Sequence, residues 1–164
     1  MEIKSKISNA DGTVTEIIYN DADSFDSLAC DKVRQAYGVC FAGDKMLIVF
    51  NGKRKAWGLI GGGLEAGETF EECLKREVIE ESNMRVLNFR PIGFQAVYAP
   101  ENDVIFQLRY VCTVEEIAPF VADPAGGDIT EIKLIDPNTY KQFFDWGEIG
   151  ERIIHRAIEM KNSL

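Results

Sequence analysis

Residues 57–84, WGLIGGGLEAGETFEECLKREVIEESNM, combine a glycine cluster with a segment rich in glutamate. Thr69 and Glu72 predict a capping box, in which each side chain accepts a hydrogen bond from the other residue's backbone N–H. This box places the start of a helix at Phe70. Asn83 predicts its end, because asparagine tolerates the left-handed conformation that closes many helices. The segment therefore predicts a helix over Phe70–Ser82.

The acidic residues of this predicted helix fall on one face. At 100° per residue, Glu77, Glu80 and Glu81 lie within a narrow arc. The first half of the same face is apolar: Phe70, Cys73 and Leu74. An acidic helix face is usually solvated, but this one follows the stripe that packs on the protein body. Crowded carboxylates repel one another, and divalent cations that prefer oxygen ligands relieve this repulsion. The pattern predicts a magnesium or manganese site.

The glycine-rich segment, residues 61–67, is expected to be a loop whose backbone approaches a ligand closely. Glu65 and Glu68 make it a poor cradle for phosphate, and the chain lacks a G-x-x-x-x-G-K-[ST] motif. We expect it to place a backbone carbonyl, of Gly61 or Gly62, beside a metal. Glu68 is either an outer metal ligand or a favourable charge at the helix N-terminus.

The segment resembles the Nudix box, G-x5-E-x7-R-E-U-x-E-E-x-G-U, where U is aliphatic. The matching positions are Gly62, Glu68, Arg76, Glu77, Val78, Glu80, Glu81 and Met84. Asn83 replaces the late glycine of the motif. Trp57, Gly61 and Gly62 also resemble the family's preceding Trp-x-x-Pro-Gly-Gly, with Ile60 in place of proline.

This resemblance implies an α+β fold, the Nudix α/β/α sandwich around a mixed β-sheet. It also implies a hydrolase acting on phosphorus-containing acid anhydrides, a Nudix pyrophosphohydrolase. The implied catalytic residues are Glu77, Glu80, Glu81 and Arg76. The implied metal ligands are Glu77, Glu80, Glu81 and the Gly61 carbonyl, binding Mg²⁺ with Mn²⁺ as the alternative. Arg76 would orient a carboxylate; taken alone, it would equally pair with Glu72 at i, i+4.

The general base is left open by the sequence. Some family members take it from the box and others from a later loop. In this chain the later candidates are Asp128 and Glu131, with Glu101 and Asp103 behind them. The attacking water would lose its proton to one of these carboxylates.

The rest of the chain predicts a mixture of strands and helices. Residues 3–19 alternate around Asp11-Gly12, which indicates a hairpin. We therefore divide the chain into a hairpin extension with its connector, residues 1–30, and a Nudix domain, residues 31–164. The hairpin is expected to pack on this domain or to form a homodimer. The remaining elements are two strands within 36–50, strands at 86–99, 104–114 and 132–135, a loop at 124–128, and helices at 138–144 and 149–161.

The sequence indicates a class of substrate but not a single compound. A small-molecule nucleotide diphosphate is expected, with Trp57 and Tyr98 stacking on it and Arg54 meeting its phosphates. Pro100 resembles a downstream proline of ADP-ribose pyrophosphatases, but the residues after it do not continue that pattern. ADP-ribose or a nucleotide sugar and a non-standard nucleoside triphosphate all remain open. The alternative class is a non-catalytic Nudix-like module that binds a nucleotide as a sensor or partner.

Composition limits the partners. The net charge of -9 argues against nucleic acid and anionic membranes. No apolar run reaches the roughly 18 residues that span a bilayer, and the N-terminus lacks a signal-like apolar stretch. We therefore expect no membrane partner and a cytoplasmic location. The four cysteines are expected to be buried thiols rather than zinc ligands or disulfides.

Overall fold

The computed structural model describes residues 1–122 and 127–164 and contains one mixed sheet. Its strands in the described residues are β1 (Glu2–Ser8), β2 (Val14–Asp21), β3 (Val33–Ala42), β4 (Lys45–Asn51), β5 (Ala56–Gly58), β6 (Ile60–Gly63), β7 (Met84–Tyr98), β8 (Ile105–Glu116) and β9 (Ile129–Ile135). The order is β1-β2-β7-β8-β3-β4-β5, while β6 pairs with β3 and β9 pairs with β4. Strands β3 and β8 run parallel, and the other pairs are antiparallel.

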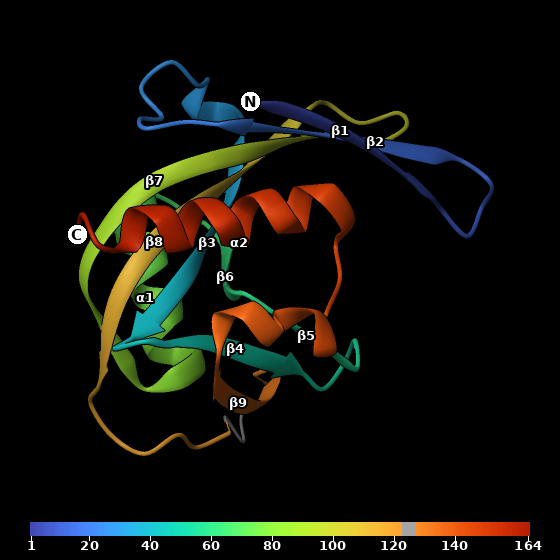
Figure 1. The fold of residues 1–164 in the computed structure, drawn as a ribbon. Coiled ribbons are helices and arrows are strands. Elements are labelled where there is room, and N and C mark those ends of the chain that lie inside the picture. Colours follow the sequence, from blue (N-terminus) through green and yellow to red (C-terminus); the bar gives the residue numbers. More distant parts are fainter. Residues whose placement is uncertain (123–126) are drawn as a thin grey trace.

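Two α-helices, α1 (Phe70–Ser82) and α2 (Gly147–Lys161), cover opposite faces of this sheet (Figure 1). Helix α1 buries Cys73, Leu74 and Val78 in one apolar cluster. Helix α2 buries its apolar stripe in a second cluster: Ile149, Ile153, Ile154 and Ala157. The chain is therefore an α+β protein with an α/β/α sandwich around a mixed sheet, as predicted.

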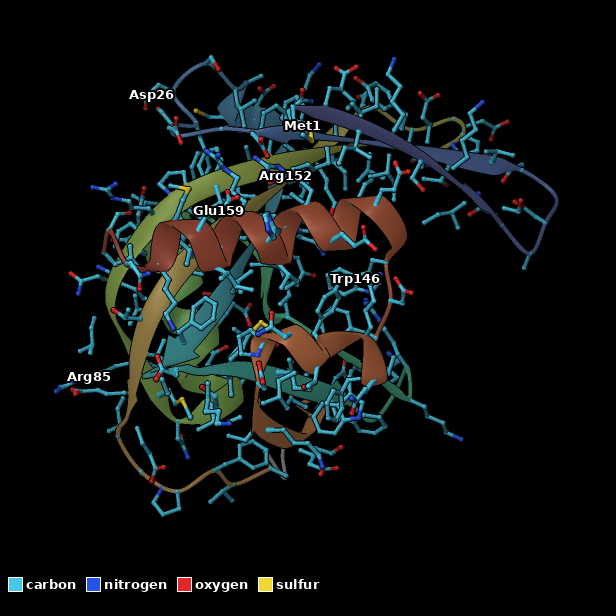
Figure 2. All side chains as sticks on the ribbon, in the orientation of Figure 1. Met1, Asp26, Arg85, Trp146, Arg152 and Glu159 are labelled. Atoms are coloured by element: carbon cyan, nitrogen blue, oxygen red, sulfur yellow. The ribbon has the colours of Figure 1, made fainter. Side chains whose placement is uncertain are left out.

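The N-terminal hairpin extends the sheet. Strand β2 pairs with β7, with Ile17 opposite Val97. The far end of the hairpin projects beyond the body of the protein (Figure 1). At its other end the hairpin meets α2, where Arg152 (labelled in Figure 2) lies. Arg152 donates to Asp21 at 2.6 Å. The hairpin thus packs on the domain, which is the first of the two arrangements that we expected. The division of the chain at residue 30 stays a prediction.

The main difference from the predicted elements is the glycine cluster. Gly61–Gly63 was expected in a loop, but these residues belong to β6 and pair with β3. Gly61 has a φ of 149°, and a Cβ there would collide with the backbone of Ala36. Glycines carry no alternating side chains, so the periodicity that predicts other strands is absent here.

Smaller differences concern the end of the chain. The helix predicted at 138–144 is a 3₁₀ helix, η2 (Pro137–Gln142), and β9 begins at Ile129 rather than at 132. Most of the loop predicted at 124–128 lies outside the described residues. A further 3₁₀ helix, η1 (Cys30–Lys32), precedes β3. The expectation of buried thiols is wrong for Cys30, which is exposed, and right for the other three cysteines. No helix in the described ranges is long and apolar enough to cross a membrane.

Candidate active site

A cleft of about 950 Å³ lies over the central strands and brings distant parts of the chain together. The N-terminal hairpin lines one part of it, and Trp57 and the start of α2 line another. The backbone of Gly61 and Gly62 lines it together with Glu77 and Glu81. Two glutamates of α1 therefore face a cavity of the size that small-molecule sites have.

Helix α1 is held at both ends as its sequence predicted. The Glu72 N–H donates to Thr69 Oγ1 at 3.1 Å, and the Thr69 N–H donates to Glu72 Oε2 at 2.8 Å. Asn83 is left-handed, with φ 55°, and its side-chain amide donates to the Pro119 carbonyl at 2.9 Å. These contacts fix where the helix begins and ends, and the buried stripe of Cys73, Leu74 and Val78 determines which face lies against the sheet.

Two of the three glutamates lie against the glycine strand. The Gly61 N–H donates to Glu81 Oε2 at 3.2 Å. The Glu77 carboxylate sits so close to Gly62 that a Cβ there would lie 2.5 Å from Glu77 Oε1. Burial is the main cause that raises the pKa of Glu77, and it raises the pKa of Glu81 to about 8. The predicted inward turn of the acidic face is thus confirmed for these two, whereas the Glu80 side chain is 57% exposed.

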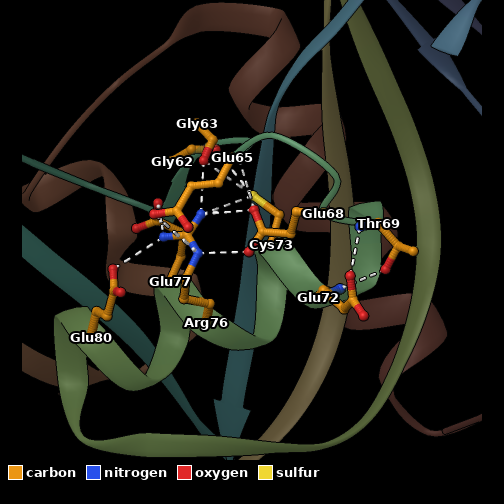
Figure 3. Close-up of polar contacts among 10 residues, drawn as sticks. All are labelled: Gly62, Gly63, Glu65, Glu68, Thr69, Glu72, Cys73, Arg76, Glu77 and Glu80. Atoms are coloured by element: carbon orange, nitrogen blue, oxygen red, sulfur yellow. Dashed lines mark hydrogen bonds and ion pairs between the residues drawn. The ribbon is translucent and has the colours of Figure 1, made fainter. Parts of the chain in front are cut away.

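Arg76 lies in the middle of this acidic group (Figure 3). Its guanidinium donates to three carboxylates: Glu68 at 2.6 Å, Glu77 at 2.9 Å and Glu80 at 3.1 Å. It also donates to the Gly63 carbonyl at 2.9 Å. The hydrogen bond from Arg76 is the main reason that the pKa of Glu68 falls to about 2. Arg76 therefore links the helix to the loop after β6, while Glu72 serves the capping box instead of pairing with Arg76.

The set of possible ligands suits a hard divalent cation, because it consists of carboxylate oxygens beside the glycine backbone of β6. In the described part of the chain, however, no three His, Cys, Asp or Glu side chains already form a group that would hold a metal ion. Arg76 engages Glu77 and Glu80, and Glu81 is turned to the Gly61 N–H. Metal binding on these residues would require the flexible glutamate side chains to turn toward one another.

The structure brings three of the other predicted site residues to the cleft. Trp57, Arg54 and Asp128 all line it. The Trp57 ring lies 5.2 Å from the ring of Phe50 and 5.8 Å from that of Phe143, so it belongs to an aromatic cluster. The Asp128 carbonyl accepts a hydrogen bond from the Gly52 N–H at 2.8 Å.

The remaining candidates lie elsewhere. Tyr98 is 46% exposed on β7, opposite Glu16 of the hairpin, and is not among the residues that line the cleft. Glu131 lies on β9 opposite Phe50 and is likewise absent from the described lining. Glu101 and Asp103 lie in the exposed turn between β7 and β8. The structure therefore does not gather these four residues with the box.

Among the described residues that line the cleft, two charged ones were missed from the sequence, Arg109 and Asp145. Arg109 on β8 is only 5% exposed, and its guanidinium lies 4.8 Å from the centre of the Tyr37 ring. Burial lowers its pKa to about 10. A signal was available, since Arg109 interrupts the apolar run LRYVC, and an arginine is rarely buried without a specific reason.

The family of this chain follows from a match between its sequence and a family profile. The NUDIX domain profile matches residues 32–157, most of the chain. This chain belongs to the NUDIX domain family.

Several relatives of this NUDIX domain are named NAD-capped RNA hydrolase NudC. The protein of Pasteurella multocida (strain Pm70) is 31% identical over 129 residues, which cover 70% of this chain and 42% of the relative. That of Haemophilus influenzae (strain PittGG) is 26% identical over 136 residues, which cover 78% and 46%. The chain spans less than half the length of these relatives. Because their name includes RNA, our expectation of no nucleic-acid partner is not confirmed.

Solved structures support the same fold. The Bacillus subtilis pyrophosphohydrolase BsRppH matches with a TM-score of 0.67 at 18% identity, covering 96% of this chain and 97% of that one. The MutT protein from Bacillus halodurans matches with a TM-score of 0.57 at 19% identity, covering 74% and 82%. At these identities the likeness shows the NUDIX fold.

Proposed function

We propose that this NUDIX domain is a Mg²⁺-dependent pyrophosphohydrolase that cleaves the diphosphate bond of a nucleoside diphosphate linked to another group. The observation that carries the proposal is the position of Glu77 and Glu81, packed against the Gly61–Gly62 backbone in the wall of the cleft. Two partly buried carboxylates beside glycine backbone are costly for the stability of the fold. In a cavity that suits a nucleotide, they can instead bind the metal ion that diphosphate hydrolysis requires.

Glu77, Glu80, Glu81 and the Gly61 carbonyl would hold the metal, with Mn²⁺ as an alternative to Mg²⁺. When bound, the metal neutralises the diphosphate charge and polarises the phosphorus atom. Arg76 holds the Glu77 carboxylate in one orientation through a charge-assisted hydrogen bond of 2.9 Å. The absence of side chains at Gly61 and Gly62 leaves room for the Ala36 backbone and for the Glu77 carboxylate, both of which a Cβ would collide with.

Asp128 is the general base that we propose among the later residues. It lines the cleft together with Glu77 and Glu81, whereas Glu131 does not. Its carboxylate would take the proton of the attacking water. Replacement by asparagine preserves the size of the side chain and removes this ability, so Asp128→Asn should lower the turnover rate and leave substrate affinity unchanged.

Three kinds of substrate are to be tested. The sequence suggests two: ADP-ribose or another nucleotide sugar, and a non-standard nucleoside triphosphate. The names of the relatives suggest the third, NAD-capped RNA. The cleft volume of about 950 Å³ suits a nucleotide conjugate. The net charge of -9 disfavours a long polyanion, so the small conjugates are our first choice.

The deciding experiment is this substrate panel with Mg²⁺, followed by analysis of the products. Glu81→Gln should slow the formation of products by orders of magnitude, because a neutral amide is a poor metal ligand. Glu71→Gln makes the same chemical change in the first turn of α1, at a residue that is not among those lining the cleft, and should leave the rate unchanged. Normal turnover by Glu81→Gln would contradict the metal assignment. Tight nucleotide binding by the wild type, with no turnover of any panel member, would favour the sensor or partner module instead.

A further inference from the structure

The bottom of the cleft carries a group of polar side chains that the proposed chemistry does not use. We call it the polar floor: Gln35 and Tyr37 on β3, Gln95 on β7, and Gln107 and Arg109 on β8. All five line the same cleft as the glutamates of the box. Side chains of this kind are costly to bury, so their presence on central strands calls for a ligand or a structural reason.

The polar floor is adjacent to the box through the sheet. Tyr37 lies opposite Arg109 on one side and opposite Gly61 on the other. Gly61 in turn donates to the Glu81 carboxylate. Because neighbouring strands are about 4.8 Å apart, Arg109 lies two strand spacings from the backbone that carries the proposed metal site. A nucleotide whose phosphates lie at Glu81 would extend its other end over Tyr37 toward Arg109.

The direction of every hydrogen bond in the polar floor follows from Arg109, because a guanidinium only donates. It donates to Gln95 Oε1 at 2.8 Å and to Gln107 Oε1 at 3.2 Å. Gln107 therefore turns its amide NH₂ away and donates to Gln35 Oε1 at 2.6 Å. The amide groups left over, the NH₂ of Gln35 and the NH₂ of Gln95, are both donors. The amides and the guanidinium of the polar floor thus offer donors to a ligand, and the Tyr37 hydroxyl can either donate or accept.

Arg109 adds an uncompensated charge to this arrangement. Its contacts are neutral amide and carbonyl oxygens and the Tyr37 ring, and it forms no ion pair with any residue in the ranges described. Its Nε–H is buried and has no hydrogen-bond partner among those residues. A buried cation with a spare donor attracts oxygen or nitrogen acceptors strongly.

The surroundings favour a flat ring over a second phosphate. Ile7 and Ile17 of the N-terminal hairpin line the cleft together with the polar floor. Apolar side chains of this kind stabilise the faces of a heterocycle, whereas a phosphate beside them would lose its hydration without compensation. The combination of apolar walls with a few directed polar groups is typical of sites that bind a base.

We propose that the polar floor binds the base of the substrate nucleotide and selects a base whose facing edge carries acceptors, such as an oxopurine, over adenine. The identification of the ligand as a nucleotide rests on the proposed function, but the selection itself requires no hydrolysis. Arginine recognises the O6 and N7 acceptors of guanine in the same way in protein–DNA complexes. The amino group at position 6 of adenine would instead meet the donors of the polar floor.

The test compares inosine 5′-monophosphate with adenosine 5′-monophosphate, which differ only in the carbonyl or amino group at position 6 and the adjoining ring nitrogen. Affinities are measured by calorimetric titration of the full chain in EDTA, so that neither metal nor turnover contributes. We expect the inosine nucleotide to bind about tenfold more tightly, the lower part of the range for one correct bidentate contact. An equal or tighter affinity for the adenosine nucleotide would overturn the proposal.

Two variants connect this preference to the polar floor. Arg109→Gln removes the charge and the spare donors, and the ratio of the two affinities should fall to about one. Gln95→Glu is of nearly equal size and replaces a donor by an acceptor beside Arg109, so the preference should fall or reverse. Arg85→Gln is the matched control, because Arg85 stands at the outer edge of the protein (Figure 2) and pairs with Glu115. A ratio measured within one variant is unaffected by a partly unfolded sample.

A last measurement, with inorganic pyrophosphate, tests whether Arg109 binds phosphate instead of a base. The affinity for pyrophosphate should be the same for the wild type and Arg109→Gln; a loss as large as that of the inosine nucleotide would make Arg109 a phosphate anchor and overturn base selection. The two proposals also fail separately. A preference for inosine without any hydrolysis rejects the proposed function alone, and hydrolysis without such a preference rejects the polar-floor proposal alone.

Discussion

Replacing Gly62 by alanine tests how the structure positions Glu77. An alanine Cβ at this position would lie 2.5 Å from Glu77 Oε1 and 2.7 Å from its carboxyl carbon. Ordinary van der Waals contact begins at 3.4 Å, so the carboxylate must move by about 1 Å. The carboxylate is the end of the flexible Glu77 side chain, so its displacement should change the site without unfolding the protein.

The expected loss of activity follows from this displacement. A misplacement of about 1 Å in an active site lowers the rate about 100-fold. The backbone of Gly62 is not left-handed, so alanine can adopt it. Alanine also reduces the conformational freedom of the unfolded chain, which adds about 0.4–1 kcal/mol to the free energy of unfolding. Gly62→Ala should thus lose most of its Mg²⁺-dependent turnover while its melting temperature changes little.

The assay measures kcat and KM with Mg²⁺ on the best substrate of the panel, with thermal unfolding on the same samples. The matched control is Gly63→Ala, because a Cβ at Gly63 would meet only the Arg34 carbonyl, at 3.8 Å. Gly63→Ala should keep the wild-type rate. Equal rates for the two variants would refute the reasoning that the bare backbone of Gly62 is needed to place the Glu77 carboxylate.

Three further predictions concern stability. Asn83→Ala should lower the free energy of unfolding by about 1 kcal/mol, because alanine is strained at a φ of 55°, whereas Asn83→Gly should lose less; urea denaturation measures both. Leu74→Ala should cost about 2–5 kcal/mol in the same assay, since Leu74 is fully buried under the sheet. Burial raises the pKa of Asp21, but the hydrogen bonds and charge of Arg152 outweigh this and lower it below 3.8. The stabilisation by Asp21 is therefore present above its unfolded pKa and is lost as the pH falls through the folded value. Wild type should lose more stability than Asp21→Asn between pH 6, about two units above the unfolded pKa, and pH 3, about one unit below it. Parallel curves would contradict this.

The sequence predicted the parts of the site that depend on near neighbours in the chain. Thr69, Glu72 and Asn83 determine where α1 begins and ends, and the 100° step then places Glu77 and Glu81 on the buried face. These features rest on backbone hydrogen bonds within one helix, so they are legible without the rest of the protein. The strands β7 and β8 were also predicted, with ends that differ from the observed ones by one or two residues.

The tertiary structure decided what the helix faces. Gly61–Gly63 forms a strand only because β3 pairs with it, and no periodic side chain reports that pairing. Tyr98 was an equally reasonable aromatic candidate, yet β7 carries it away from the cleft. Arg109 and Tyr37 become neighbours through the parallel pairing of β8 with β3, which joins residues far apart in the chain. Helix geometry depends on residues three and four positions apart, whereas the cleft depends on the lateral order of strands, and only the folded sheet determines that order.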